Sequence, residues 1–222
     1  MTPVPQDEPH DEPLGGHARL SRSERRLQLL RVAQALFSSE GYHHVSMDDI
    51  ADHAQVSKPV LYRHFPSKLD LYLAVIDECG RDLLATIDAA VAPVAAGTAQ
   101  DGRAVVAAIV RAYITFVDIA GEASTLLFES DVTHDADART RVGHASRQAA
   151  DRITEVIVQV ATLPDEEART VAAALVAMAE GAALHRMRHE GSASAEVTAD
   201  LVARLAWAGV AGLVEDSRTA TT

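Results

Sequence analysis

A short segment between two helix-start signals, Ser57–Lys68, constrains the fold of this chain more than any other feature. Ser57 is a residue type that caps helices, because its hydroxyl can accept a hydrogen bond from a backbone N–H of the first turn. Pro59 follows in that turn, where a missing N–H costs little. Pro66 ends the segment and Ser67 begins the next helix. The segment therefore predicts a helix of under two turns, which needs a neighbouring helix to be stable.

A neighbouring helix is predicted directly upstream, beginning at Ser46. Asp49 stands three residues later, at the position of the partner in a capping box. Apolar residues follow at helical spacing, namely Met47, Ile50, Ala51 and Ala54. A helix, a tight turn and a second short helix form a helix-turn-helix motif, whose second helix can enter the major groove of DNA.

Eight residues in and beside this motif are candidate DNA contacts. Lysines can pair with phosphates, and tyrosine or histidine side chains can donate to phosphate oxygens or touch thymine methyl groups. The candidates are Ser46, Ser57, Lys58, Pro59, Tyr62, Arg63, His64 and Lys68.

Residues 25–77 resemble the DNA-binding domain of the TetR family of transcriptional regulators. The resemblance rests on spaced blocks in the family's order: Leu30–Phe37, Gly41–Tyr42, Ser46–Ala51, Val56–Phe65 and Ser67–Lys68. It implies a helical regulator that binds operator DNA, with a small-molecule pocket in its C-terminal domain and a dimer interface in its last helices. Two positions depart from the family's pattern. Gln55 occupies a turn position where the family often has glycine, and Asp48 stands where some relatives have a basic or polar DNA-contacting residue.

Downstream of the motif, apolar residues recur at helical spacing and no segment alternates like a strand, so we expect an all-α fold. A helix from Ser67 to about Ala90 should join the two domains, and a linker should begin at Pro93. The expected organisation is a disordered tail over residues 1–20, a three-helix DNA-binding domain over 21–83, a larger helical ligand-binding and dimerisation domain over 84–216, and a flexible tail over 217–222.

The net charge of −12 is unfavourable for DNA binding, but the charge is distributed unevenly along the chain. Residues 1–16 contribute −4, residues 17–70 contribute +2 and residues 71–222 contribute −10. The positive balance is confined to the segment that holds the motif, which indicates a local DNA-binding patch rather than long-range steering. The four arginines between residues 17 and 26 either touch DNA phosphates or the minor groove, or form a solvated, frayed helix start.

The last two predicted helices are rich in small residues, which allow helices to approach closely. We interpret these faces as a homodimer interface, a four-helix bundle with two helices from each subunit, which would match a palindromic operator. The alternative is packing within one subunit. The residues are Ala173, Ala177, Gly181 and Leu184 in one helix and Leu201, Leu205, Ala208, Gly209 and Gly212 in the other.

The resemblance also implies an effector pocket in the C-terminal domain, and aromatic and apolar side chains there are its candidate lining. These candidates are Tyr113, Phe116, Phe128 and Met178, with His144 or Arg147 as polar groups. For each aromatic residue, ordinary core packing is the alternative.

We therefore expect a dimeric repressor that a small apolar or aromatic ligand releases from double-stranded operator DNA. A metal sensor is an alternative, because His185 and His189 are four residues apart on one helix; a helical interaction module without DNA binding is another. We expect no cofactor. The chain lacks a Gly-rich phosphate loop and the H-E-x-x-H and G-x-S-x-G motifs, so we do not expect an enzyme.

One cysteine, Cys79, excludes an internal disulfide and fits a reducing cytoplasm. We expect it to be a small core residue, with a redox sensor as the alternative. The acidic N-terminal segment is not a secretory signal. No apolar run approaches membrane-spanning length, so no membrane partner is expected.

Overall fold

The computed structural model describes residues 20–97, 101–128, 136–160, 163–189 and 193–219. Within these ranges the chain is all-helical, as expected. The elements are α1 (Arg22–Glu40), α2 (Met47–His53), α3 (Lys58–His64), α4 (Lys68–Ala95), α5 (Gly102–Ala120), the 3-10 helix η1 (Gly121–Ser124), α6 (Thr125–Phe128), α7 (Ala136–Val160), α8 (Asp165–Arg188) and α9 (Ala195–Thr219). Of the expected N-terminal tail, only Leu20 lies within the described residues, and the expected C-terminal tail begins inside α9.

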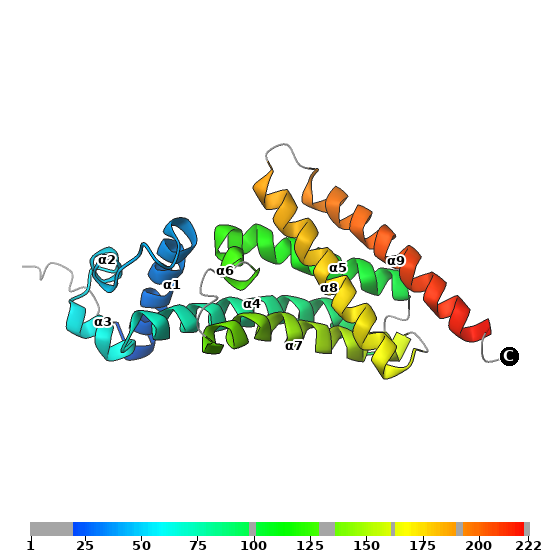
Figure 1. The fold of residues 1–222 in the computed structure, drawn as a ribbon, viewed down its shortest axis with the longest axis horizontal. Helices are drawn as coiled ribbons and strands as arrows, with labels where there is room; N and C mark the ends of the chain where they lie inside the picture. The colour runs from blue at the N-terminus through cyan, green and yellow to red at the C-terminus, as the bar shows by residue number, and fades with distance from the viewer. Residues whose placement is uncertain (1–19, 98–100, 129–135, 161–162, 190–192, 220–222) are drawn as a thin grey trace, which may run out of the picture.

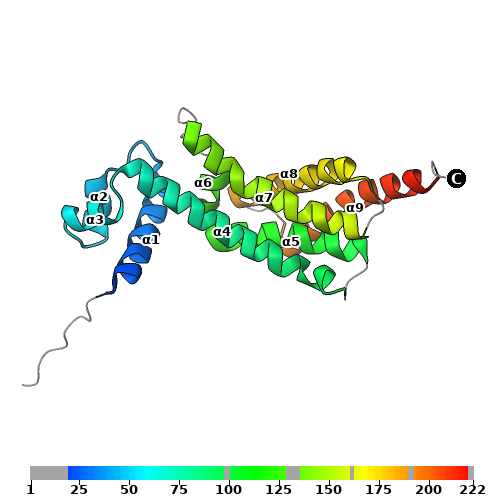
Figure 2. The same cartoon turned by 90° about the horizontal axis from the view of Figure 1, so that it is seen from below.

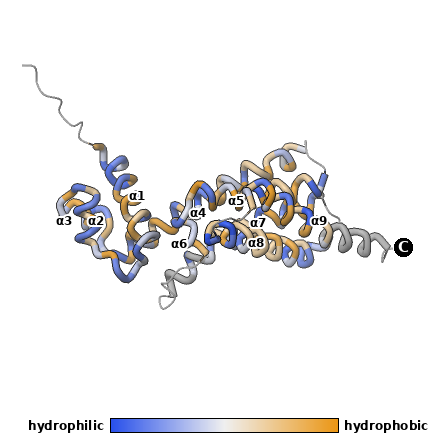
Figure 3. The backbone as a smooth tube through the Cα atoms, turned by 90° about the horizontal axis from the view of Figure 1, so that it is seen from above, coloured by the Kyte–Doolittle hydropathy of each residue, from blue (hydrophilic) through white to orange (hydrophobic). Residues whose placement is uncertain are grey.

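The molecule is elongated, with α1, α2 and α3 at one end and the C-terminal helices at the other (Figures 1 and 2). Helix α4 runs from the end that holds α3 into the C-terminal helices, and α7 packs along it. Helices α8 and α9 both pack on α5. The tube in Figure 3 shows α1 changing from a hydrophilic start to a more apolar stretch. Because α4 is continuous across residues 83 and 84, the two expected domains share this helix.

Side-chain caps begin the first helices as expected. Ser21 with Glu24, and Ser46 with Asp49, form complete capping boxes. The Ser67 hydroxyl accepts the Asp70 N–H at 3.1 Å, which caps α4. Each cap satisfies a backbone donor that a helix start leaves unpaired.

The predicted side-chain cap at Ser57 is wrong. Ser57 is the N-cap residue of α3 by position, but its side chain makes no capping hydrogen bond. Pro59 has no N–H to offer, and the Val60 N–H donates to the Ser57 carbonyl oxygen at 2.9 Å instead. Helix α3 therefore depends on the fixed backbone of Pro59 and on the complete burial of Leu61.

The turn between α2 and α3 contains the only described non-glycine residue with positive φ, Gln55 at +53°. The Val56 N–H donates to the Ala51 carbonyl at 3.0 Å, which is the 6→1 hydrogen bond of a Schellman motif at the end of α2. Such an end needs a left-handed residue, which explains why the family often has glycine at this position.

We expect Gln55→Gly to raise the free energy of unfolding by up to about 1 kcal/mol. A side chain in the left-handed region costs about 1–2 kcal/mol, and the extra freedom of glycine in the unfolded chain cancels about 0.5–1 kcal/mol of the gain. The measurement is the urea midpoint at constant m value. Arg31→Gly, in the exposed face of α1, is the control and should lose about 1 kcal/mol. A lower midpoint for Gln55→Gly would contradict the assignment of strain to this turn.

The predicted end of the fourth helix near Ala90 is wrong, because α4 continues through Pro93 to Ala95. A proline this close to a helix end removes only one hydrogen bond of the last turn. Val91 and Val94 are buried on either side of it, so packing holds the extra turn in place.

Helices α4 and α7 approach closely at Gly80. A Cβ atom added at Gly80 would lie 3.0 Å from the Cβ of Ala145, so even an alanine there would require Ala145 to move by a few tenths of an ångström. Ion pairs flank the contact, Arg141–Asp77 at 3.0 Å and Arg152–Asp88 at 3.3 Å. Close packing and two ion pairs thus hold α4 against α7 of the C-terminal domain.

The stretch Gly102–Phe128 is long and apolar enough to cross a membrane by composition alone, contrary to the expectation that no such run exists. Half of its most apolar window is buried inside the protein. Helix α5 packs against α4, α8 and α9, so its composition is that of a central core helix.

Candidate nucleic-acid interface

Helix α1 holds both ends of the helix-turn-helix motif. The Gln28 side-chain amide donates to the Ala54 carbonyl at 3.2 Å, at the end of α2. The Arg26 guanidinium donates to the His64 carbonyl at 3.3 Å and lies 4.3 Å from the centre of the Phe65 ring, at the end of α3. Phe65 is buried, as expected for the inner face of α3. The outer face of α3 is therefore presented on a fixed support.

Two of the candidate DNA contacts on that outer face have no carboxylate partner among the described residues. Tyr62 is 46% exposed and Arg63 is exposed. Pro59 and Ser57 are exposed at the start of the same helix. These residues form the part of α3 that a DNA groove can reach.

Lys58 is exposed but paired within the domain. Its Nζ lies 2.6 Å from Oδ2 of Asp48, at the start of α2. This hydrogen bond and the charge of Asp48 raise the pKa of Lys58, and Asp52 adds to the effect. Asp48, the acidic departure from the family pattern, is thus a competitor that a phosphate must displace to reach Lys58.

Ser46 and Lys68 are also occupied within the domain. The Ser46 hydroxyl donates to Oδ2 of Asp49 at 2.6 Å as part of the capping box. The Lys68 ammonium lies 4.3 Å from the centre of the Tyr42 ring and is half-buried, and burial lowers its pKa. Both residues stabilise the motif in the free protein.

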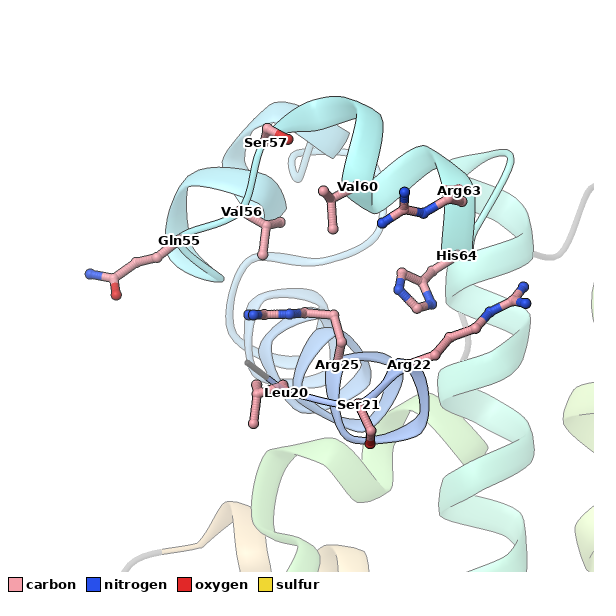
Figure 4. Close-up of a pocket in the computed structure, with 10 residues that line it drawn as sticks. All are labelled: Leu20, Ser21, Arg22, Arg25, Gln55, Val56, Ser57, Val60, Arg63 and His64. Atoms are coloured by element: carbon pink, nitrogen blue, oxygen red, sulfur yellow. The ribbon is translucent and has the colours of Figure 1, made fainter. Parts of the chain in front are cut away.

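A cavity of about 660 Å³ lies between the start of α1 and α3, and it brings together arginines that are far apart in the sequence. Arg22 and Arg25 extend from α1 and Arg63 from α3, with Val56 and Val60 between them (Figure 4). The lining residues are Leu20, Ser21, Arg22, Arg25, Gln55, Val56, Ser57, Val60, Arg63 and His64. None of these described lining residues is acidic. We call this cavity the arginine groove.

Two interactions shape the electrostatics of the arginine groove. The Arg25 guanidinium donates to the Gln28 side-chain oxygen at 2.6 Å, which fixes its position beside the motif. Burial lowers the pKa of His64, and the neighbouring arginines Arg22, Arg63, Arg26 and Arg25 lower it further. Both effects favour the neutral form of His64, and the three arginines that line the groove give it a positive charge.

We expect DNA affinity to rise as the pH falls from about 7.5 to about 5.5, with His64 responsible for part of the rise. A phosphate in the arginine groove would offset the arginine charges and raise the pKa of His64, so binding takes up a proton, at most about a tenfold gain per pH unit. The measurement is fluorescence anisotropy with a random-sequence duplex for wild type and His64→Gln. His185→Gln, an exposed residue of α8 that does not line the arginine groove, is the control. Identical pH profiles for wild type and His64→Gln would exclude this role.

The structure brings some of the candidate pocket residues together. Tyr113 and Phe116 are buried on α5, and the Phe116 and Phe128 rings lie 6.2 Å apart in an edge-to-face arrangement. Met178 is half-buried against the same core. By contrast, His144 and Arg147 are exposed on α7, and the Arg147 guanidinium donates to the Thr140 carbonyl.

A half-buried charged group that sequence reasoning missed lies beside Tyr113. The Glu180 carboxylate accepts a hydrogen bond from the Ser146 hydroxyl at 2.8 Å, and burial raises the pKa of Glu180. Burial and the Glu180 charge also raise the pKa of the Tyr113 hydroxyl. The available signal was Glu180 itself, the only charged residue between Val171 and Leu184.

Two further side-chain candidates have clear surroundings. Cys79 is buried, and burial raises the pKa of its thiol to about 12, which confirms a core residue rather than a reactive thiol. The rings of His185 and His189 stack 4.2 Å apart, and the His189 Nδ1–H donates to the His185 carbonyl. Within the described ranges no group of three or more metal-ligating side chains lies together.

The supported α3, its exposed outer face and the adjacent arginine groove define a helix-turn-helix DNA-binding protein. Residues 29–75 match the family model described as bacterial regulatory proteins of the tetR family. The chain is 34% identical over 201 residues to the transcriptional activator FasR of Mycolicibacterium smegmatis, across 89% of this chain and 90% of that protein. It therefore belongs to the TetR family of DNA-binding transcriptional regulators, which are not enzymes.

Two further comparisons agree with this assignment. The repressor KstR of Mycobacterium tuberculosis is 39% identical over 56 residues, which cover 25% of this chain and 26% of that protein. The crystal structure of a TetR-like regulator from Rhodococcus sp. RHA1 is similar with a TM-score of 0.67 and 28% identity, covering 87% of this chain and all of that one. The expected order, a helix-turn-helix domain followed by a larger helical domain, is thereby confirmed.

Proposed function

We propose that the protein is a homodimeric regulator in the cytoplasm that binds a palindromic operator and is released from it by a small apolar or aromatic ligand. The observation that carries the proposal is an uncovered apolar face on α8 and α9. Val197, Leu201 and Leu205 follow each other at four-residue spacing along α9 and are 50%, 50% and 68% exposed. Packing within one subunit leaves all three in water.

The neighbouring helix offers a matching surface. Ala173, Ala177 and Gly181 lie at the same spacing on α8 and are exposed. A Cβ added at Gly181 or Gly209 would meet no described atom within 4 Å, so nothing within the subunit explains these small residues. Since α8 and α9 both pack on α5, their exposed stripes lie on the side away from it. A second copy of the chain would cover them as a four-helix bundle.

Operator recognition in such a dimer depends on the distance between two copies of α3. Half-sites one DNA turn apart require recognition helices separated by about 34–36 Å. Tyr62 would reach base edges or phosphates in each half-site, and the arginine groove, with Arg63, would hold the adjacent backbone.

The effector would bind in the C-terminal domain, around the buried aromatic residues of α5. The Tyr113 hydroxyl has no hydrogen-bond partner among the described residues, an arrangement that costs about 1–3 kcal/mol. A ligand whose single polar group reaches Tyr113 and Glu180, and whose apolar part packs on Phe116 and Met178, would remove that cost. His144 and Arg147, which are exposed on α7, would then not contact the ligand.

The test combines operator selection with calorimetry. Selection from a random DNA pool identifies the operator, and a palindrome is expected. Aromatic and apolar compounds are then titrated into the protein with and without operator. A ligand that weakens operator binding by about 5–150-fold must itself bind more weakly by the same factor when operator is present. Equal ligand affinity in both titrations for every compound that binds would refute ligand-induced release.

The sign of regulation requires a separate measurement. Release from an operator that overlaps a promoter would make this chain a repressor, as the sequence analysis expects. FasR is named an activator and KstR a repressor, so relatives of both kinds exist. Transcription in vitro from the selected operator, with and without the protein, decides between them.

A further inference from the structure

The arginine groove opens at the residue where an acidic segment of the same chain joins α1. Leu20 and Ser21 line the groove and immediately follow residues 1–19. Residues 1–16 contain four acids, Asp7, Glu8, Asp11 and Glu12, and no lysine or arginine. The groove contributes Arg22, Arg25 and Arg63 and no described acidic residue. Complementary charges are thus placed next to each other in the chain.

The connection between them is short enough for direct contact. Glu12 and Leu20 are eight positions apart, and an extended chain covers at most about 3.6 Å per position, so the Glu12 backbone stays within about 29 Å of the groove. A tether of this length gives an effective concentration in the millimolar range. At that concentration the contact is populated if its dissociation constant is about 1 mM or lower, which several ion pairs formed together can supply.

We propose that residues 1–16 occupy the arginine groove in the DNA-free protein and compete with DNA phosphates for its arginines. The carboxylates of the segment pair with guanidinium groups, for which carboxylate and phosphate are alternative ligands. The inference rests on the proposed role of the groove in holding the DNA backbone. DNA must displace the segment, so binding is weakened most at low salt, where the internal ion pairs are strongest.

The first test neutralises the acidic segment in the full-length protein. Asp7→Asn/Glu8→Gln/Asp11→Asn/Glu12→Gln should bind a random-sequence duplex about three- to tenfold more tightly at about 50 mM salt, with the gain fading toward about 200 mM. A matched control neutralises four exposed acids of the C-terminal helices, Asp151, Glu155, Glu167 and Glu196. This control should change the affinity less than twofold. Unchanged affinity of the segment variant would overturn the proposal.

The second test separates docking from simple repulsion between the acidic segment and DNA. The same neutralisation is made in an Arg22→Ala/Arg25→Ala/Arg63→Ala background. Docking predicts that the gain disappears, because the segment no longer has a site to occupy. Simple repulsion predicts that the full gain remains, and that outcome would overturn the proposal.

A third measurement needs no DNA and therefore does not depend on the proposed function. The Nε–Hε resonances of arginines in the ¹⁵N-labelled protein should shift between wild type and the neutralised segment variant, at Arg22, Arg25 or Arg63. If the resonances shift but removal of the three arginines does not change DNA affinity, the segment docks in the groove and the groove does not bind DNA. Unshifted resonances at all three arginines would refute docking.

Discussion

Leu205→Glu is expected to make the protein monomeric and to reduce operator affinity by at least about 100-fold. Leu205 is 68% exposed on α9 in one subunit, so the substitution should leave the fold of that subunit intact. In the proposed dimer the glutamate would be buried without a partner, which costs several kcal/mol per interface. A loss of about 2.8 kcal/mol already corresponds to a factor of 100. A monomer presents one recognition helix and loses half of the operator contacts.

The measurements are sedimentation equilibrium and operator binding, with far-UV circular dichroism to check the fold. Val158→Glu is a matched control, because Val158 is an apolar residue of α7 that is 41% exposed outside the proposed interface. The control should remain dimeric and bind operator as wild type does. Dimerisation of Leu205→Glu at wild-type strength would place the interface on another face.

Local signals allowed most helix starts to be predicted. The capping boxes at Ser21 and Ser46 and the cap at Ser67 involve residues three positions apart, so the sequence contains both partners. The predictions of helix caps and helix ends were wrong where another contact overrides the local sequence signal. At Ser57 a backbone hydrogen bond replaces the side-chain cap, and at Pro93 the burial of Val91 and Val94 extends α4 beyond its local stop signal.

The candidate site was predictable only as far as it lies on one short helix. The sequence identified the exposed residues of α3, but the arginine groove arises from contact between α1 and α3, which no local pattern encodes. The partners of Lys58 and Lys68, Asp48 and Tyr42, are likewise tertiary contacts. These contacts change what each residue can contribute, because a paired lysine must first lose its partner.

Tertiary contacts also add a second connection between the domains. The sequence indicated α4 as the link, and the structure packs η1 against α1 as well. The Ser124 hydroxyl of η1 lies 3.7 Å from the Met187 sulfur of α8. A displacement of α8 can therefore be transmitted to α1 through η1, without movement of α4. A ligand that shifts α8 could therefore tilt the DNA-binding domain about α1.

Removal of the groove arginines is expected to have the second large effect. Arg25→Ala and Arg63→Ala should each weaken DNA binding about tenfold or more, since a hydrogen bond to a charged group contributes about 1.5–3 kcal/mol. Each should also reduce the slope of log affinity against log salt by about one unit, the signature of one lost phosphate contact. The losses should be similar on operator and random DNA, because phosphate contacts carry no sequence information.

Lys58→Ala is the informative comparison for these arginines. Lys58 is already paired with Asp48 at 2.6 Å, so phosphate binding must exchange one ion pair for another. Removal of the Lys58 side chain should therefore reduce the slope of log affinity against log salt by less than about half a unit, compared with about one unit for the loss of a full phosphate contact. Tyr62→Ala, in contrast, should weaken operator binding without changing the slope, because its side chain carries no charge. A full unit lost in Lys58→Ala with none lost in Arg25→Ala and Arg63→Ala would shift the backbone contact from the arginine groove to the α2 side of the motif.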